Sequence, residues 1–230
     1  TERLAPAQEA APDNPQVLAR AGMIAFNQGR FQEAVEIFQR GVELAPNARY
    51  LAGALAQSQH VSGDSAAAVA TLGDWLEKAP QDEQLRLLQA TLLLELGREQ
   101  EAIDAYQRYL ESGQENALVL NNLAWLLRES DTDEALRLIA RAADIAPESG
   151  EILDTKGVIQ LEQGNASEAI ATFKQALELS PDLLSIRLNL AEALIAEGQT
   201  EEARQQLERL LTEELAPDEQ RKAEELLNQL

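Results

Sequence analysis

Residues 150–183 read GEILDTKGVIQLEQGNASEAIATFKQALELSPDL, a stretch of 34 residues with small or helix-breaking residues at four places. Gly157 is its eighth residue, Gly164 its fifteenth, Ala169 its twentieth and Pro181 its thirty-second. The segments between these places are rich in Ala, Leu, Glu and Gln, which favour helices. The stretch therefore predicts two helices that are joined by a turn at Gly164 and ended by Pro181.

The same places recur along almost the whole chain. Prolines that follow helical stretches are spaced by 34, 34, 67 and 34 residues, and three further series keep that period. The series are Pro12, Pro46, Pro80, Pro147 and Pro181; Gly29, Gly63, Gly97, Gly164 and Gly198; Ala34, Ala68, Ala102, Ala135, Ala169 and Ala203; and Gly22, Ala56, Ala90, Ala124, Gly157 and Ala191. One step of 33 places a single deletion between Ala124 and Ala135, where residues 128–131 (RESD) replace the Gly turn.

This spacing resembles the tetratricopeptide repeat (TPR), whose unit has small residues at its eighth and twentieth places and Pro near its thirty-second. Small residues there let the two antiparallel helices approach closely. The resemblance implies an all-α fold, a right-handed α-solenoid of about six helical hairpins with a C-terminal capping helix. The expected repeats are 15–48, 49–82, 83–116, 117–149, 150–183 and 184–217. Repeat 2 departs from the motif, because Trp75 stands where a small residue is common.

The two ends of the chain differ from the repeats. Residues 218–230 follow Pro217 with acidic residues in their first turn, and they predict a capping helix with a polar outer face. Residues 1–14 place Leu4, Ala7 and Pro12 where the end of a preceding repeat would have them. We interpret this segment as the tail of a truncated repeat, with a linker as the alternative.

Composition excludes several classes of function. The formal net charge is −21, with 40 acidic and 19 basic residues, so the basic stripe that nucleic-acid binding requires is missing. The chain has no cysteine and one histidine, His60, and no phosphate-binding, dinucleotide or EF-hand motif. No run of eighteen apolar residues is present, so direct membrane insertion of this segment is not expected. We predict a non-catalytic protein without cofactor or metal, whose partner is a protein or peptide.

In a TPR array the first helix of each repeat lines a concave face, and the resemblance assigns groove positions by place. In repeats 1 and 2 these positions include Arg20, Met23, Phe26, Asn27, Tyr50, Gln57 and His60. In repeats 3 to 6 they include Leu87, Leu88, Thr91, Leu94, Asn121, Asn122, Trp125, Arg128, Asp154, Thr155, Val158, Leu188, Asn189 and Glu192. These residues form the candidate binding surface.

Two features of this surface have competing interpretations. Asn122 and Asn189 occupy the same place two repeats apart, and such amides can pair with the backbone of an extended peptide. Two such residues are a weak signal, and the alternative is that they are solvated polar residues or make local helix contacts. Trp125 lies one turn from both Asn122 and Arg128, which suits either an anchor for a partner or a filler between repeats.

The first repeats carry a second apolar patch, formed by Met23, Phe26 and Tyr50. It serves either as a binding surface or as packing surface that a preceding repeat would cover. If it is uncovered, chains could associate through their N-terminal ends. His60 is interpreted as a polar groove or inter-repeat residue rather than a catalytic one.

The last three repeats also resemble the C-terminal part of TPR lipoproteins from bacterial PEP-CTERM sorting and exopolysaccharide systems. The similar stretches are NALVLNNLAWLLRE (116–129), DEALRLIARAADIAPESGEILDTKGVIQLEQG (133–164) and the tail EARQQLERLLTEE (202–214). Lys156-Gly157-Val158 departs from the aromatic residue common there. This resemblance implies a periplasmic or outer-membrane-associated scaffold, with a cytoplasmic protein as the alternative. Two other functions remain open, a self-associating scaffold and a regulatory domain of a larger enzyme.

Overall fold

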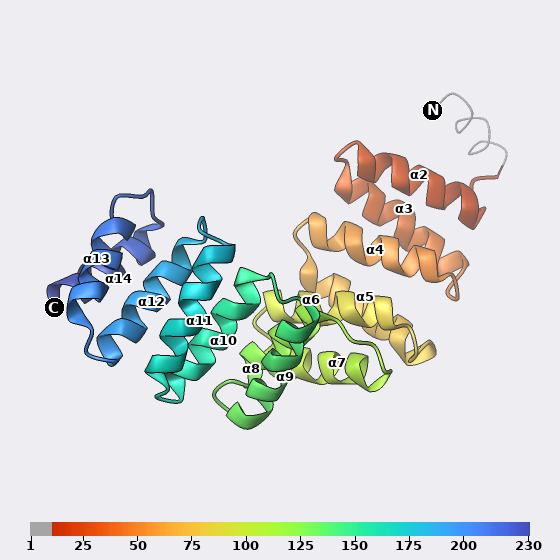
Figure 1. The fold of residues 1–230 in the computed structure, drawn as a ribbon. Helices are drawn as coiled ribbons and strands as arrows, with labels where there is room; N and C mark the ends of the chain where they lie inside the picture. The colour runs from red at the N-terminus through yellow and green to blue at the C-terminus, as the bar shows by residue number, and fades with distance from the viewer. Residues whose placement is uncertain (1–10) are drawn as a thin grey trace. The chain divides into compact units, whose positions relative to one another are not determined.

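The computed structural model describes residues 11–230, which contain thirteen helices, α2 to α14, and no strand (Figure 1). The all-α prediction is confirmed. Leu4 and Ala7, which we assigned to a truncated repeat, lie outside the described residues. The chain divides into two compact halves, 1–114 and 115–230, which are described separately below as the N-terminal and C-terminal halves.

The first twelve of these helices form six consecutive pairs, and α14 follows the last pair. In the N-terminal half the helices are α2 (Pro15–Asn27), α3 (Phe31–Leu44), α4 (Arg49–Val61), α5 (Ser65–Lys78), α6 (Glu83–Glu95) and α7 (Glu99–Glu111). In the C-terminal half they are α8 (Ala117–Leu127), α9 (Thr132–Ile145), α10 (Gly150–Glu162), α11 (Ala166–Leu179), α12 (Leu184–Ala196), α13 (Thr200–Leu210) and α14 (Pro217–Asn228).

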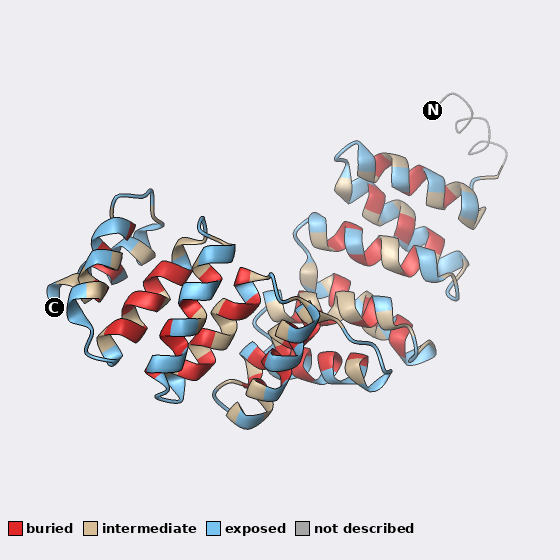
Figure 2. Ribbon diagram, viewed as in Figure 1, coloured by how far each residue is buried: buried red, intermediate tan, exposed pale blue. Residues whose placement is uncertain are grey.

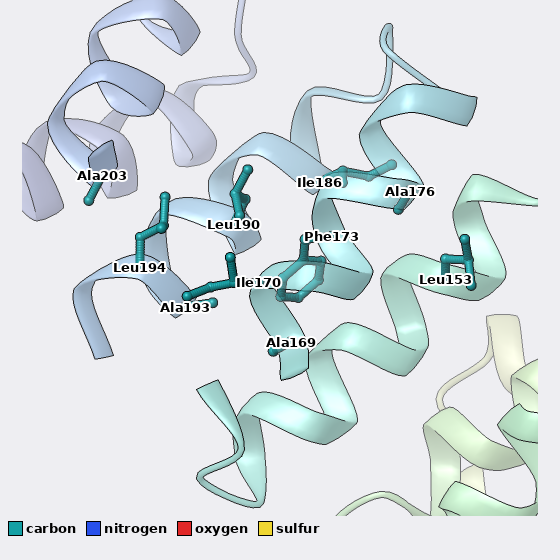
Figure 3. Close-up of a cluster of buried hydrophobic side chains, with 10 residues drawn as sticks. All are labelled: Leu153, Ala169, Ile170, Phe173, Ala176, Ile186, Leu190, Ala193, Leu194 and Ala203. Carbon is teal, nitrogen blue, oxygen red and sulfur yellow. The ribbon is translucent and has the colours of Figure 1, made fainter. Parts of the chain in front are cut away.

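Within each half, every helix packs on its hairpin partner and on the next helix along the chain. Buried residues therefore form stripes along the helices rather than one central core (Figure 2). In repeat 5 the stripe centres on Phe173 of α11, which lies between Leu153 of α10 and Ile186 and Leu190 of α12 (Figure 3). Neighbouring repeats share one core, so each repeat depends on the next for burial of its apolar residues.

The eighth place of each repeat is small because an aromatic or branched side chain of the second helix packs directly over it. A methyl group added at Gly157 would lie 2.5 Å from the Phe173 ring, and one added at Gly22 would lie 2.7 Å from the Phe38 ring. Both rings are almost fully buried. Gly thus stands where Phe is opposite, whereas Ala56, Ala124 and Ala191 stand in repeats that carry Leu72, Ile139 and Leu207 at the corresponding place, and Ala90 stands in repeat 3, which carries Tyr106 there.

The turn of repeat 4 explains the 33-residue step. In the other five repeats the turn between the two helices contains a glycine with positive φ, such as Gly164 at 81°. Repeat 4 has no glycine there and no residue of positive φ, and α8 ends after 11 residues instead of 13. Asp131 then caps α9 by accepting a hydrogen bond from the Glu134 amide at 3.1 Å.

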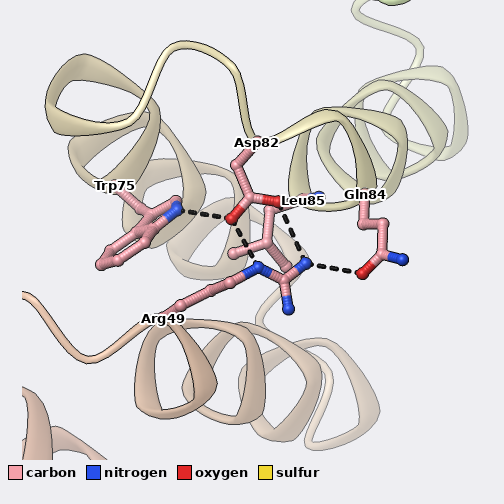
Figure 4. A network of polar contacts seen from close by, with 5 residues as sticks. All are labelled: Arg49, Trp75, Asp82, Gln84 and Leu85. Carbon is pink, nitrogen blue, oxygen red and sulfur yellow. Dashed lines mark hydrogen bonds and ion pairs between the residues drawn. The ribbon is translucent and has the colours of Figure 1, made fainter.

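A buried carboxylate ties repeat 2 to repeat 3 (Figure 4). Asp82 is the N-cap residue of α6, and its side chain is 9% exposed. It accepts hydrogen bonds from Trp75 Nε1 at 2.9 Å, from Arg49 Nε at 2.7 Å and from the Leu85 amide at 3.3 Å. Trp75, the departure from the TPR pattern, is therefore anchored through its indole nitrogen.

Asp82 should make stability depend on pH in acid. Burial raises the pKa of this carboxyl, but the hydrogen bonds from Arg49, Trp75 and Leu85 together lower it by more. The net pKa is therefore depressed. A depressed pKa stabilises the fold above the unfolded value of about 3.9, and this contribution is lost as pH falls through the folded pKa. Urea unfolding below about pH 4 should show a smaller pH dependence for Asp82→Asn than for the parent chain. Equal slopes would contradict the role assigned to Asp82.

The C-terminal helix begins at Pro217, one residue earlier than expected, because Pro suits the first helical position. Its Ala223 is fully buried and lies in one cluster with Leu188, Leu207 and Leu210. The helix thus covers the end of repeat 6.

Candidate protein-binding surface

In the C-terminal half, the first helices of repeats 4, 5 and 6 lie next to one another, with α10 in contact with both α8 and α12. Two side-chain contacts join these helices. Arg128, which follows α8, contacts Glu162 of α10, and Asp154 of α10 contacts Asn189 of α12. We use the term C-terminal face for the surface made by Leu118, Asn121, Asn122, Trp125, Arg128, Asp154, Thr155, Glu162, Asn189 and Glu192.

Trp125 lies open on this face, with 41% of its surface exposed. The Arg128 guanidinium carbon lies 4.0 Å from the centre of the indole ring, which is a cation–π contact. Arg128 also donates to the Trp125 carbonyl at 2.8 Å and lies 3.3 Å from Glu162 Oε1. These contacts hold the indole in place, so its exposed surface is ordered before any partner arrives. Leu118, two turns earlier on α8, is 57% exposed.

Several polar side chains of this face already make hydrogen bonds within the chain, which limits those that a partner could use. Asn189 Nδ2 donates to Asp154 Oδ1 at 2.9 Å, so this amide already has a partner within the chain. Asn121 Nδ2 lies 3.5 Å from Asn122 Oδ1, at the limit of a hydrogen bond. Thr155 Oγ1 donates to the Glu151 carbonyl. Asn121 Oδ1 is a buried acceptor without a hydrogen bond among the described residues.

Asp154 is the unusual charge of this face. It is half-buried, and within residues 11–230 no Lys or Arg lies within ion-pair distance of it. Burial raises the pKa of the carboxyl, and the hydrogen bond from Asn189 offsets part of that rise. Glu162 and Glu192, by contrast, are paired with Arg128 and Lys222. Asp154 is therefore the carboxylate that a cation from outside the chain would stabilise most.

In the N-terminal half, Met23 of α2 and Tyr50 of α4 are 48% and 50% exposed, and Arg20 and Asn27 are also exposed. Phe26 differs from the other members of the predicted apolar patch. It packs against the cluster around Phe38, and its ring meets Phe31 edge-on at 5.3 Å. The open apolar residues of that patch are therefore Met23 and Tyr50.

His60 lies near polar groups of its own repeat and of the next one. Its Nδ1 lies 2.9 Å from Ser65 Oγ and 3.7 Å from Glu95 Oε2 of the next repeat. No group of three or more His, Asp or Glu residues in the described part of the chain could hold a metal ion.

The assignment of Leu188 to the open face was wrong. Leu188 is 6% exposed and packs with Leu207, Leu210 and Ala223. The C-terminal helix α14 packs over Leu188 in the last repeat, and the repeat pattern of the sequence does not predict this contact. Two contacts were also absent from the predicted site, the Asp154–Asn189 hydrogen bond and the Arg128–Trp125 stacking.

Family models confirm the repeat. Two tetratricopeptide repeat models match, one over residues 1–58 and 160–230 and the other over 54–117, 87–150 and 126–183. The chain belongs to the tetratricopeptide repeat family. TPR proteins are generally protein-interaction scaffolds, and their repeats are typically non-catalytic.

Relatives of this TPR chain are proteins with different roles. It is 29% identical over 196 residues to the human protein O-mannosyl-transferase TMTC1, covering 83% of this chain and 22% of the relative. It is 25% identical over 207 residues to the human mitochondrial import receptor subunit TOM70, covering 84% of this chain and 33% of the relative. The chain thus spans between about a fifth and a third of these relatives' length.

Among solved structures, the fold is similar to YrrB, a TPR protein described as having an unusual peptide-binding site. The TM-score is 0.70 at 17% identity, over 80% of this chain and 95% of YrrB. At this identity the likeness concerns the fold. None of the described helices is both long and apolar enough to span a bilayer.

Proposed function

We propose that this chain is a non-catalytic scaffold that binds an extended segment of a partner protein across the C-terminal face. The observation that carries this proposal is that the neighbouring helices α8 and α10 carry an open indole stacked by Arg128 and a half-buried carboxylate without a cationic partner. Trp is enriched among the residues of binding hot spots.

The charges of the face favour a partner with basic residues. Residues 115–230 contain 24 acidic and 10 basic side chains, which disfavours a second copy of this acidic chain on the same face. A Lys or Arg of the partner would pair with Asp154, while an apolar residue would cover Trp125 and Leu118.

We further propose a place for this scaffold in the bacterial envelope, in the assembly of polysaccharide or sorted surface proteins. The support is the resemblance of residues 116–129 and 133–164 to TPR lipoproteins of those systems. A cytoplasmic scaffold is the alternative.

A second candidate is a regulatory domain of a larger enzyme. It is favoured by the relation to TMTC1, a transferase of which the matched repeats form 22%. The complete gene separates the two proposals, because it either encodes a catalytic domain beside these repeats or does not.

The binding proposal predicts that short peptides selected from a random displayed library on the immobilised chain carry Lys or Arg beside an apolar residue. Trp125→Ala should weaken the selected peptide by at least about tenfold, because an anchor side chain is lost. Asp154→Asn should weaken binding of the same peptide by about tenfold, because the Lys or Arg of the peptide loses its carboxylate partner. Fluorescence polarisation of the labelled peptide measures both changes.

Matched variants on the second helix of repeat 4 serve as controls. Ile145→Ala removes another exposed apolar side chain, and Asp144→Asn removes another exposed charge. Both should leave the affinity within about twofold. If Trp125→Ala binds like Ile145→Ala, the partner does not use this face.

A further inference from the structure

A buried cation in the last repeat lacks a carboxylate partner. Arg187 of α12 is 6% exposed, and its Nη1 donates to Gln206 Oε1 at 2.8 Å. Within the described residues, no Asp or Glu lies within ion-pair distance of its guanidinium. In a chain of net charge −21, a buried Arg without an acidic partner calls for an explanation.

Arg187 lines a pocket whose other walls carry further positive charge. The pocket has a volume of about 340 Å³ and lies among α11, α12 and α13. Its polar lining consists of Lys174, Glu178, Arg187, Gln206 and Arg209. Lys174 is paired with Glu202 at 2.7 Å, so two guanidinium groups face one carboxylate, that of Glu178.

The electrostatics oppose two unpaired guanidinium groups in this place. Burial lowers the pKa of Arg187 and the neighbouring Arg209 lowers it further, while Glu213 acts in the opposite direction. A bound anion would offset both the cost of burying the Arg187 charge and its repulsion from Arg209, because it would accept hydrogen bonds from the two guanidinium groups.

Repeat 3 supplies an internal comparison. Arg86 occupies the same fourth place as Arg187 and is also buried, at 8% exposed. Its guanidinium donates to the Pro80 carbonyl, whereas that of Arg187 donates to the Gln206 side chain. A buried Arg at this place therefore does not by itself create a site; in repeat 6, Arg187 lines a pocket together with Arg209.

We propose that the pocket between α11 and α13 is an oxyanion-binding site in which Arg187 and Arg209 hold a phosphate or carboxylate group. It lies on different residues from the C-terminal face and would add a second point of recognition to the scaffold. Its ligand is either free phosphate or the carboxylate of an acidic peptide, which share the geometry that guanidinium groups recognise.

The test follows the Arg side-chain Nε–H resonances of the whole chain by NMR at constant ionic strength. One arm titrates sodium phosphate and the other titrates the tetrapeptide Gly-Ser-Asp-Glu. We expect saturable shifts of Arg187 and Arg209 in at least one arm, and a response to phosphate alone or peptide alone identifies the source. Arg209→Gln, an exposed position, should weaken binding by at least about fivefold. Arg137→Gln, an exposed Arg of α9, should not.

Stability provides an independent measurement on the same site. Arg187→Met should raise the melting temperature in the absence of anions, because an apolar side chain replaces an uncompensated buried charge. It should also abolish the shift of Arg209 on titration. Three results would overturn the proposal and assign Arg187 to contacts within the chain. They are non-saturable shifts in both arms, an Arg187 shift in Arg209→Gln equal to that in the parent chain, and a lower melting temperature for Arg187→Met. None of these results depends on peptide binding at Trp125.

Discussion

Gly157→Ala should destabilise the chain by about 1 kcal/mol, although Ala is intrinsically the better helix former. The new methyl group would lie 2.5 Å from the buried Phe173 ring, and overpacking of this kind costs about 1–3 kcal/mol. The gain in helix propensity, up to about 1 kcal/mol, offsets only part of that cost. Urea unfolding followed by far-UV circular dichroism measures the difference.

The repeat alignment supplies a compensating change. Repeats 2, 4 and 6 combine Ala at the eighth place with Leu or Ile at the place of Phe173, so Phe173→Leu should relieve the clash. The double variant should be more stable than the sum of the two single changes predicts, by about 1 kcal/mol. Gly73→Ala is the matched control. Its methyl group meets only Gln89 at 3.5 Å, so this variant should be stabilised by about 0.5–1 kcal/mol.

Asp82→Ala should destabilise the chain by about 2–4 kcal/mol. The change removes the cap of α6, leaves the buried Trp75 indole nitrogen without its acceptor and separates Arg49 from its carboxylate. A lost cap costs about 1 kcal/mol, and an unsatisfied buried donor costs about 1–3 kcal/mol. Equilibrium unfolding in urea, with Trp fluorescence as a second signal, measures this loss.

Asp64 is the matched control for this change. It caps α5 by accepting one hydrogen bond from the Ala67 amide at 3.0 Å, and it is exposed. Asp64→Ala should therefore cost only about 1 kcal/mol. Similar losses for the two variants would mean that Asp82 acts as an ordinary cap and not as a link between repeats.

The fold could be predicted because its determinants are local and repeated. Gly22, Gly157 and the turn glycines such as Gly164 occupy fixed places, and each has a steric reason in the structure. The deletion in repeat 4 was also placed correctly, since residues 128–131 form the turn without glycine. The role of Trp75 was not predicted, because its indole contacts Asp82 seven residues later through the geometry of the turn.

For the candidate site, the sequence predicted only which positions of each repeat lie on the binding surface, and not the contacts between them. Repeat position indicates which residues line the first helices, and Met23, Tyr50 and Trp125 are indeed exposed there. It contains no information on pairing between repeats, so neither the Asp154–Asn189 contact nor the burial of Leu188 could be read from it. The sequence did hold a signal for Arg187, since a charged residue stands within the apolar run LSIRLNL (184–190).

Acrylamide quenching of Trp fluorescence, with and without a peptide selected on the chain, tests binding at the C-terminal face most directly. The chain has two Trp residues, and Trp75 is 9% exposed whereas Trp125 is 41% exposed, so quenching of the free chain reports mainly on Trp125. A partner on the C-terminal face should cover the indole and reduce the quenching constant by about half or more at saturation. Unchanged quenching at saturating peptide would show that the partner binds elsewhere and would contradict the proposed function.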